Sequence, residues 1–148
     1  MEKIYTTKSH RQTQKLGEKF AREILKTPLQ KEAMVLGLQG NLGGGKTTFL
    51  QGFAKGLGIK EKILSPTFVI LKRFEIRKSF KNLYHIDCYR LKNAKDILEI
   101  DFKKIIKDPK NIIAIEWSEK IKKLLPKNII LIDFKFIDKN KRELNIKM

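Results

Sequence analysis

The chain has 148 residues, of which 41% are hydrophobic, and it carries a formal net charge of +17 at pH 7. This length allows one domain with a substantial core, so we expect residues 1–148 to form a single domain, and the apolar runs fall short of the roughly 20 residues that a membrane helix needs. The single cysteine, Cys88, excludes an internal disulfide and, with the polar N-terminal stretch MEKIYTTKSHRQ, predicts a cytoplasmic protein.

The first predicted elements surround a stretch of glycines. Apolar side chains recur at helical spacing over residues 9–26, which predicts an amphipathic helix. The short apolar run 33–38 predicts a buried strand, and the glycines follow it directly. A second helix is expected over residues 46–57, closed by Gly58 in a left-handed conformation.

The middle of the chain predicts a hairpin and a helix. The segments SPTFVILKRFEI (65–76) and LYHIDCYR (83–90) are rich in strand-forming residues and are joined by a short polar turn, which favours an antiparallel pair. By the period of two, His85, Asp87 and Tyr89 should share one face of the second strand. Asn93 is expected to cap a helix over residues 94–107.

The last third of the chain predicts a buried strand and a second hairpin. A buried strand is predicted for IIAIEW (112–117), which is apolar up to Glu116. Ser118 is expected to cap a short helix after this strand. Residues 128–137 and 142–148 form the expected hairpin. Because strands and helices alternate along the chain, we expect an α/β fold with a mainly parallel sheet and antiparallel hairpin additions.

The glycine-rich stretch fits a known phosphate-binding pattern. Gly40, Gly45, Lys46 and Thr47 match G-x-x-x-x-G-K-[ST], between a predicted strand and a predicted helix. A loop without side chains can turn its N–H groups toward a phosphate, and the helix that follows directs its positive end at the same anion. Lys46 would reach the β- and γ-phosphates, and Thr47 would ligate Mg²⁺. The alternative is a glycine-rich turn with a solvated lysine. The motif thus predicts a P-loop NTPase-like three-layer sandwich.

Two acids are candidates for the metal and water chemistry of such a site. Glu116 ends the run IIAI, where a Walker B strand would end, and Asp87 lies within HIDCYR. The alternative for each is a carboxylate that only faces water or pairs at the surface. His85 is expected to pack or hydrogen-bond rather than ligate a metal, because no other ligand stands at a metal-site spacing. Cys88 is expected to act as a small apolar side chain.

Thr67 is a further candidate, in the loop Ser65-Pro66-Thr67. A threonine placed there could sense the γ-phosphate, as switch threonines do. The alternative is an ordinary turn before a strand, and the local chemistry does not separate the two.

The positive charge has two interpretations. A basic surface attracts nucleic acid, which would bring tRNA near the protein. Lysines outnumber arginines by 27 to 6, however, and they are scattered along the whole chain. Base and bidentate phosphate recognition favours arginine, so a general compositional bias is the preferred interpretation.

Taken together, these motifs resemble the TsaE family, the P-loop ATPase of bacterial tRNA threonylcarbamoyladenosine (t6A) biosynthesis. The matching segments are GLQGNLGGGKTTF, SPTFVI, HIDCYRL and IEWSEK, and a Ser9…Thr13 pair fits the start of the family pattern. The resemblance runs from about residue 9 to residue 132. It implies an Mg²⁺-dependent ATPase that acts with the threonylcarbamoyl-transferase subunit (TsaD) and its dimerising partner (TsaB). ATP hydrolysis would reset that complex between turnovers.

The resemblance also implies roles for individual residues. Thr47 would hold Mg²⁺ with Asp87 or Glu116, and the other acid would position water. Thr67 would approach the γ-phosphate, Lys46 would act on the phosphates, and Trp117 would lie beside the site. The nucleotide would be bound by Gly40, Asn41, Leu42, Gly43, Gly44, Gly45, Lys46, Thr47 and Thr48.

Two other functions fit parts of the sequence. A small-molecule P-loop kinase would use the same loop, but such kinases usually carry an arginine-bearing lid, and arginine is scarce here. A non-catalytic nucleic-acid binder would rely on charge alone and would not need the phosphate loop. The preference for ATP over GTP comes from the resemblance, since no base-reading motif is present.

Overall fold

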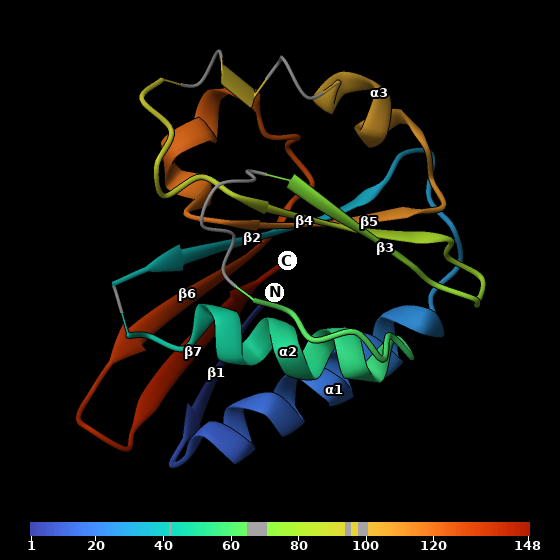
Figure 1. Ribbon diagram of the computed structural model, residues 1–148. Helices are drawn as coiled ribbons and strands as arrows, with labels where there is room; N and C mark the ends of the chain where they lie inside the picture. Colours follow the sequence, from blue (N-terminus) through green and yellow to red (C-terminus); the bar gives the residue numbers. More distant parts are fainter. Residues whose placement is uncertain (42, 65–70, 94–95, 98–100) are drawn as a thin grey trace.

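A computed structural model of the chain describes residues 1–41, 43–64, 71–93, 96–97 and 101–148. The described strands form one seven-stranded sheet in the order β1-β7-β6-β2-β5-β4-β3 (Figure 1). The elements, in chain order, are β1 (Glu2–Thr7), α1 (His10–Leu25), β2 (Met34–Gly40), α2 (Lys46–Gly56), β3 (Leu71–Glu75), β4 (Asn82–Asp87), α3 (Phe102–Lys107), β5 (Asn111–Glu116), the 3₁₀ segment η2 (Ser118–Leu124), β6 (Ile130–Phe136) and β7 (Arg142–Lys147).

The middle of the sheet is parallel and its margins are antiparallel. β2 pairs in parallel with β5 and β6, and β5 pairs in parallel with β4. The hairpins β3–β4 and β6–β7 add antiparallel strands on either side, and β1 pairs with β7 at one edge. The predicted α/β class with antiparallel hairpin additions is therefore confirmed.

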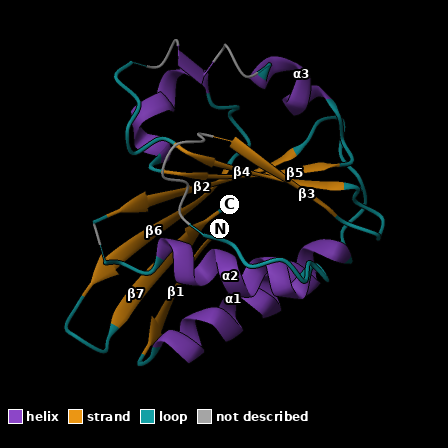
Figure 2. Ribbon diagram, viewed as in Figure 1, coloured by secondary structure: helices purple, strands orange, loops and turns teal. Residues whose placement is uncertain are grey.

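Helices cover both faces of the sheet and make three layers (Figure 2). α1 and α2 lie together on one face, while α3 and η2 lie on the other. Alternate residues of β2 point to opposite faces of the sheet. Leu36 and Leu38 pack toward α1 and α2, whereas Val35 packs on the opposite face. A strand buried on both faces must be apolar throughout, which explains the continuous run in the sequence.

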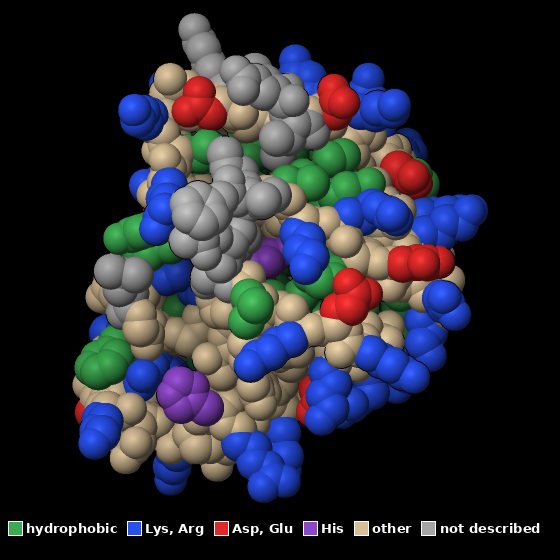
Figure 3. Space-filling model, viewed as in Figure 1, with side chains coloured by type: hydrophobic (Ala, Val, Ile, Leu, Met, Phe, Trp, Pro, Cys, Tyr) green, Lys and Arg blue, Asp and Glu red, His purple; other side chains and the backbone are tan. Residues whose placement is uncertain are grey.

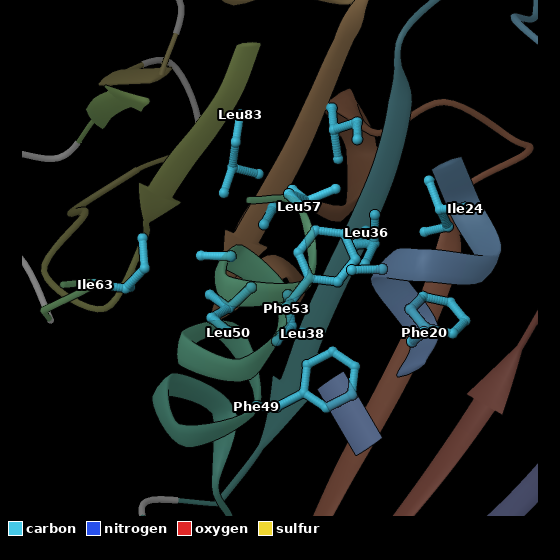
Figure 4. Close-up of a cluster of buried hydrophobic side chains, with 14 of the residues drawn as sticks. Phe20, Ile24, Leu36, Leu38, Phe49, Leu50, Phe53, Leu57, Ile63 and Leu83 are labelled. Carbon is cyan, nitrogen blue, oxygen red and sulfur yellow. The ribbon is translucent and has the colours of Figure 1, made fainter. Parts of the chain in front are cut away.

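The core under α1 and α2 is built largely from aromatic and leucine side chains (Figure 4). Phe49 and Phe53 of α2 stack with ring centroids 6.4 Å apart, and Phe20 of α1 contacts both rings. Leu36 and Leu38 of β2 form the floor of this cluster. This packing fixes α2 against β2 and so fixes the start of α2 at the end of that strand.

Both helices that flank the glycines form as predicted. Ser9 caps α1, since its hydroxyl accepts the N–H of Gln12 at 3.1 Å. Gly58 follows α2 with φ 86°, the left-handed conformation expected of it. Among the described residues, no helix is long and apolar enough to cross a membrane.

Two of the predicted helix starts are wrong. The helix predicted over residues 94–107 begins only at Phe102, because Asp101 has φ 57° and a left-handed residue cannot continue an α-helix. Residues 94–95 and 98–100 of that prediction lie outside the described residues. Ser118 is not the cap of η2, because Trp117 takes that position with φ 59° and no side chain caps the segment.

The strands differ from prediction at the edges. β4 ends at Asp87 rather than at Arg90, because the chain turns there and Asp87 Oδ1 accepts the N–H of Tyr89 at 2.9 Å. Tyr89 therefore does not share a strand face with His85. Residues 65–70 of the preceding predicted strand lie outside the described residues, and β1 was not predicted at all.

Candidate functional site

Three glycines in the loop between β2 and α2 have backbone conformations that other residues rarely adopt. Gly40, Gly43 and Gly45 all have positive φ, with 125° at Gly40 and 100° at Gly45. A Cβ atom on Gly40 would lie 2.1 Å from the carbonyl oxygen of Phe134 in β6. A side chain is therefore excluded at Gly40 by conformation and by space, and at Gly43 and Gly45 it is disfavoured by conformation alone. The loop leads directly into the N-terminus of α2.

A cavity of about 390 Å³ opens in front of this helix N-terminus. It is lined by residues 43–48 and, among others, by Asp87, Glu116 and Trp117. The parallel pairing explains why they meet, since Leu38 lies beside Glu116 and Glu116 lies beside Asp87 at the same edge of the sheet. Most of the predicted site residues are thus brought together.

Two predicted residues do not line the cavity, and two others lie outside the described residues. Gly40 and Asn41 do not line it, but their carbonyl oxygens accept hydrogen bonds from the Lys46 ammonium at 2.8 Å and 2.9 Å. Leu42 and Thr67 lie outside the described residues. The predictions made for Leu42 and Thr67 stay predictions.

Lys46 is held in place by its surroundings. Its side chain is almost fully buried, and its Nζ atom lies 4.1 Å from the centroid of the Trp117 ring. Burial lowers the pKa of Lys46, while the negative charges of Glu116, Glu119 and Asp87 act in the opposite direction. The carbonyl oxygens of Gly40 and Asn41 and the face of the Trp117 ring thus hold the ammonium at the loop, where it could bind an anion in the cavity.

Thr47, Glu116 and His85 form a chain of hydrogen bonds behind the lysine. The Thr47 hydroxyl donates to Glu116 Oε1 at 2.9 Å, and His85 Nε2 lies 2.6 Å from Glu116 Oε2. Glu116 is 3% exposed and His85 is 1% exposed. Both carboxylate oxygens of this buried acid are therefore hydrogen-bonded, as burial of a charged group requires.

Asp87 is only half buried and faces the same cavity. Burial raises the pKa of Asp87, the N–H of Tyr89 that it accepts acts to lower it, and the charge of Glu116 adds to the rise. In the next position, burial raises the pKa of the Cys88 thiol to about 12, so the thiol stays protonated. Cys88 is packed in the core, as predicted for a small apolar side chain.

Trp117 reaches the site through an unusual backbone. Its φ of 59° is rare for a bulky residue and turns the chain sharply after β5. The indole ring then packs between Lys46 and Tyr89, whose ring centroid lies 5.1 Å away. A strained residue beside a cluster of charged groups is a common feature of functional sites.

The oxygen atoms of the site fit a hard divalent cation such as Mg²⁺. Thr47 supplies a hydroxyl group, and Glu116 and Asp87 supply carboxylates at the same cavity. Across the described ranges, no group of three or more His, Cys, Asp or Glu side chains is placed to hold a metal ion. Mg²⁺ typically binds through one or two carboxylates together with water and substrate phosphates, so this donor set suits Mg²⁺ and not a tightly enclosed metal.

Four residues that line the cavity were not predicted as site residues: His10, Tyr89, Arg90 and Arg142. Arg142, at the start of β7, donates from Nε to the Gly43 carbonyl at 2.6 Å and lies over the Phe136 ring. His10, at the start of α1, lies 3.4 Å from the Thr48 hydroxyl. Tyr89 and Arg90 belong to the matching segment HIDCYRL, which was a signal for them, whereas no local pattern marked His10 or Arg142.

Residues 7–144 match the family model described as "Threonylcarbamoyl adenosine biosynthesis protein TsaE". The "tRNA threonylcarbamoyladenosine biosynthesis protein TsaE" of Rickettsia typhi is 37% identical over 145 residues, which cover 97% of this chain and 94% of that protein. The protein of the same description from Bacillus subtilis is 38% identical over 114 residues, covering 77% of this chain and 69% of that protein.

A solved structure has the same fold. A crystal structure of YdiB from Bacillus subtilis superposes with a TM-score of 0.72 at 29% sequence identity. The alignment covers 99% of this chain and 84% of that one.

Proposed function

This chain belongs to the TsaE family, and from that premise we propose that it binds ATP with Mg²⁺ at the phosphate loop and hydrolyses it. The family takes part in the biosynthesis of threonylcarbamoyladenosine in tRNA. The observation that carries the proposal is the 2.9 Å hydrogen bond from the Thr47 hydroxyl to Glu116. This bond joins Thr47, the residue after the loop lysine, to Glu116, the acid that ends the neighbouring strand. A hydroxyl and a carboxylate in these two places are the protein ligands of a nucleotide-bound Mg²⁺ in P-loop proteins.

Binding is the work of the loop and of Lys46. The N–H groups of residues 43–48 surround the phosphate chain, and the N-terminus of α2 adds its positive end. The Lys46 ammonium leaves the carbonyl oxygens of Gly40 and Asn41 and pairs with phosphate oxygens, which recovers the charge interaction that burial opposes.

The two acids divide the remaining tasks. Glu116 and Thr47 hold Mg²⁺, which when bound neutralises charge on the phosphate oxygens. Asp87 orients the attacking water, because it is the more exposed carboxylate and its raised pKa makes it a stronger base than an ordinary aspartate. Thr67, which lies outside the described residues, keeps the role that the family resemblance implies, that of approaching the γ-phosphate. Trp117 closes the side of the site next to Lys46.

The hydrolysis serves the tRNA-modifying system in the cytoplasm. The partners are the threonylcarbamoyl-transferase subunit (TsaD) and its dimerising partner (TsaB), and the chain resets their complex between turnovers. What supports this role is the membership of the family together with a cavity at the phosphate loop that is lined by most of the residues expected to bind a nucleotide.

The test is an ATP-binding and ATPase assay of the purified chain, with and without the transferase complex and with GTP as a competitor. Lys46→Ala should weaken ATP binding roughly 10- to 100-fold, because a hydrogen bond to a charged group contributes about 1.5–3 kcal/mol. It should also abolish hydrolysis while the thermal unfolding transition stays cooperative.

Lys55→Ala is the matched control, since Lys55 lies on the same helix with its side chain 78% exposed. It should bind and hydrolyse ATP like the unaltered chain. Equal ATP affinity in the Lys46→Ala and Lys55→Ala variants would contradict the proposal. Phosphate transfer to a nucleoside or sugar would instead favour the small-molecule kinase.

A further inference from the structure

We propose that His85 is a positioning residue: it fixes the Glu116 carboxylate in the orientation in which its other oxygen meets Thr47. This inference rests on the proposed function, because it concerns the acid assigned to Mg²⁺. His85 Nε2 lies 2.6 Å from Glu116 Oε2, and Thr47 donates to Oε1 of the same carboxylate at 2.9 Å. The sequence predicted that His85 packs or hydrogen-bonds, which this contact confirms, but it did not indicate the partner.

The chemistry of the pair fixes which atom donates. A carboxylate that binds Mg²⁺ is ionised and only accepts hydrogen bonds, so in the proposed site the imidazole donates from Nε2. Both side chains are at least 97% buried, His85 at 1% exposed and Glu116 at 3%. Water therefore has little access to replace the imidazole, and a buried acceptor that loses its donor is costly.

The strand pairing brings the two side chains together. β4 and β5 run in parallel, with Asp87 beside Glu116 and His85 beside Ala114. His85 is therefore the diagonal neighbour of Glu116, at a distance that only long side chains bridge. The residue directly opposite His85 is a fully buried alanine, which leaves room for the imidazole to lean toward Glu116.

Without this hydrogen bond, Glu116 has an alternative orientation. The terminal torsion of a glutamate is broad, so a carboxylate held at one oxygen only can rotate about it. The charge of Glu116 already acts on the ammonium of Lys46. A freed carboxylate would turn toward that cation and away from the direction that Mg²⁺ requires. His85 thus keeps the acid available to the metal and the lysine available to phosphate.

The experiment uses the purified full chain and compares two substitutions. His85→Gln keeps an N–H donor at about the reach of Nε2, whereas His85→Leu keeps the bulk and removes the donor. Two quantities are measured: the affinity for ATP at saturating and at zero Mg²⁺, and the Mg²⁺ concentration for half-maximal hydrolysis. Loss of an outer hydrogen bond to a metal ligand typically costs 10- to 100-fold in metal affinity.

His85→Leu should raise the half-maximal Mg²⁺ concentration about tenfold or more while ATP affinity without Mg²⁺ changes less than about twofold. His85→Gln should restore most of the Mg²⁺ response. Asn82→Leu is the matched control, because Asn82 bonds Asn111 at 3.0 Å and so joins the same two strands at their other end. It should lower the stability and leave the Mg²⁺ requirement unchanged.

The outcomes separate the two claims. If Mg²⁺ does not affect ATP binding by the unaltered chain, the proposed function is wrong. If Mg²⁺ does affect ATP binding, and folded His85→Leu keeps the ordinary Mg²⁺ requirement, the role of His85 is overturned.

If His85→Leu does not fold, His85→Asn takes its place in the experiment, because the shorter asparagine amide cannot reach Glu116. His85→Gln should then keep the ordinary Mg²⁺ requirement and His85→Asn should not. Equal Mg²⁺ requirements in these two variants would overturn the inference.

Discussion

At the scale of single residues, the surroundings of Asp87 favour its neutral form. Burial raises the pKa of Asp87, and the nearby charge of Glu116 adds to this effect. For an acid whose pKa is higher in the folded chain than in the unfolded chain, ionisation weakens the fold. This unfavourable contribution is absent below the ordinary value of 3.8 and is fully present once the pH exceeds the pKa of the folded chain.

Asp87→Asn should therefore stabilise the protein at pH 7 and abolish hydrolysis. The amide oxygen can still accept the N–H of Tyr89, so only the charge is lost. We expect a gain of at most about 1 kcal/mol, or about 2–4 °C in Tm, because the side chain is half exposed. The gain should shrink as the pH falls toward 3.8.

The measurement is thermal unfolding across pH, and Asp108→Asn is the control. Asp108 is exposed and accepts the N–H of Lys110 at 2.9 Å in the same local arrangement. The prediction is contradicted if Asp87→Asn has a lower Tm than the unaltered protein at pH 7 while Asp108→Asn has the same Tm. That result would show that the Asp87 charge stabilises the fold.

The residues of the site that could be predicted are those fixed by local chain geometry. Lys46 and Thr47 follow a loop whose shape depends on its glycines, and Glu116 ends a strand that is otherwise apolar. The short-range pattern of the sequence was therefore enough to identify these three residues. Arg142 bonds the Gly43 carbonyl from 99 positions away, and no local pattern encodes such a contact. The role of His85 is likewise invisible without the pairing of β4 with β5.

At the scale of elements, α1 and α2 pack unusually closely. A Cβ atom on Gly52 would lie 1.8 Å from the Gln14 carbonyl oxygen, and one on Gly17 would lie 2.2 Å from the Phe49 carbonyl oxygen. Each helix thus presents a glycine to the backbone of the other. The contact supports the start of α2, and with it the phosphate loop.

Gly52→Ala should destabilise the protein even though alanine favours helices. The gain in helix propensity is at most about 1 kcal/mol, whereas backbone shifts in a closely packed interior cost about 1–3 kcal/mol or more. Denaturant unfolding measures the difference, and the exposed Lys55→Ala change on the same helix should stay within about 0.5 kcal/mol. A Gly52→Ala protein as stable as the original would mean that the helices can separate without cost.

Helices and strands were predicted well where their own sequence periodicity determines the structure, and poorly where pairing with a distant part of the chain determines it. α1, α2 and both hairpins carry clear local patterns. The left-handed turns at Asp101 and Trp117 do not, because positive φ is uncommon even for aspartate, which adopts it more often than most residues, and is rarer still for a bulky residue such as tryptophan. β1 was missed since it depends on pairing with β7 at the far end of the chain.

At the scale of the whole molecule, the charge is spread rather than gathered. Figure 3 shows lysine and arginine side chains at many places around the margins of the visible face, most of them on the right and below, with a few acidic side chains between them. The first and last strands lie side by side, because β1 pairs with β7 and the Met1 amino group donates to the Met148 carbonyl at 3.1 Å. A net charge of +17 on such a surface attracts any polyanion without selecting one.

Binding of tRNA by the isolated chain should therefore be weak, salt-dependent and unselective. We expect the affinity to fall at least about tenfold when salt rises from about 50 to about 200 mM, through release of counterions. Heparin should compete as well as unmodified tRNA in a filter-binding assay. Retention of tRNA at the higher salt concentration in the presence of excess heparin would instead reveal a dedicated RNA surface.

The contact between Lys46 and Trp117 has an optical consequence. Trp117 is the single tryptophan of the chain, and the ammonium that would bind phosphate lies 4.1 Å from its ring centroid. Any ligand that draws this cation away changes the electric field at the only indole fluorophore. The intensity or wavelength of its emission should therefore follow nucleotide occupancy in the unlabelled protein, and Lys46→Ala should remove that response because the cation itself is gone.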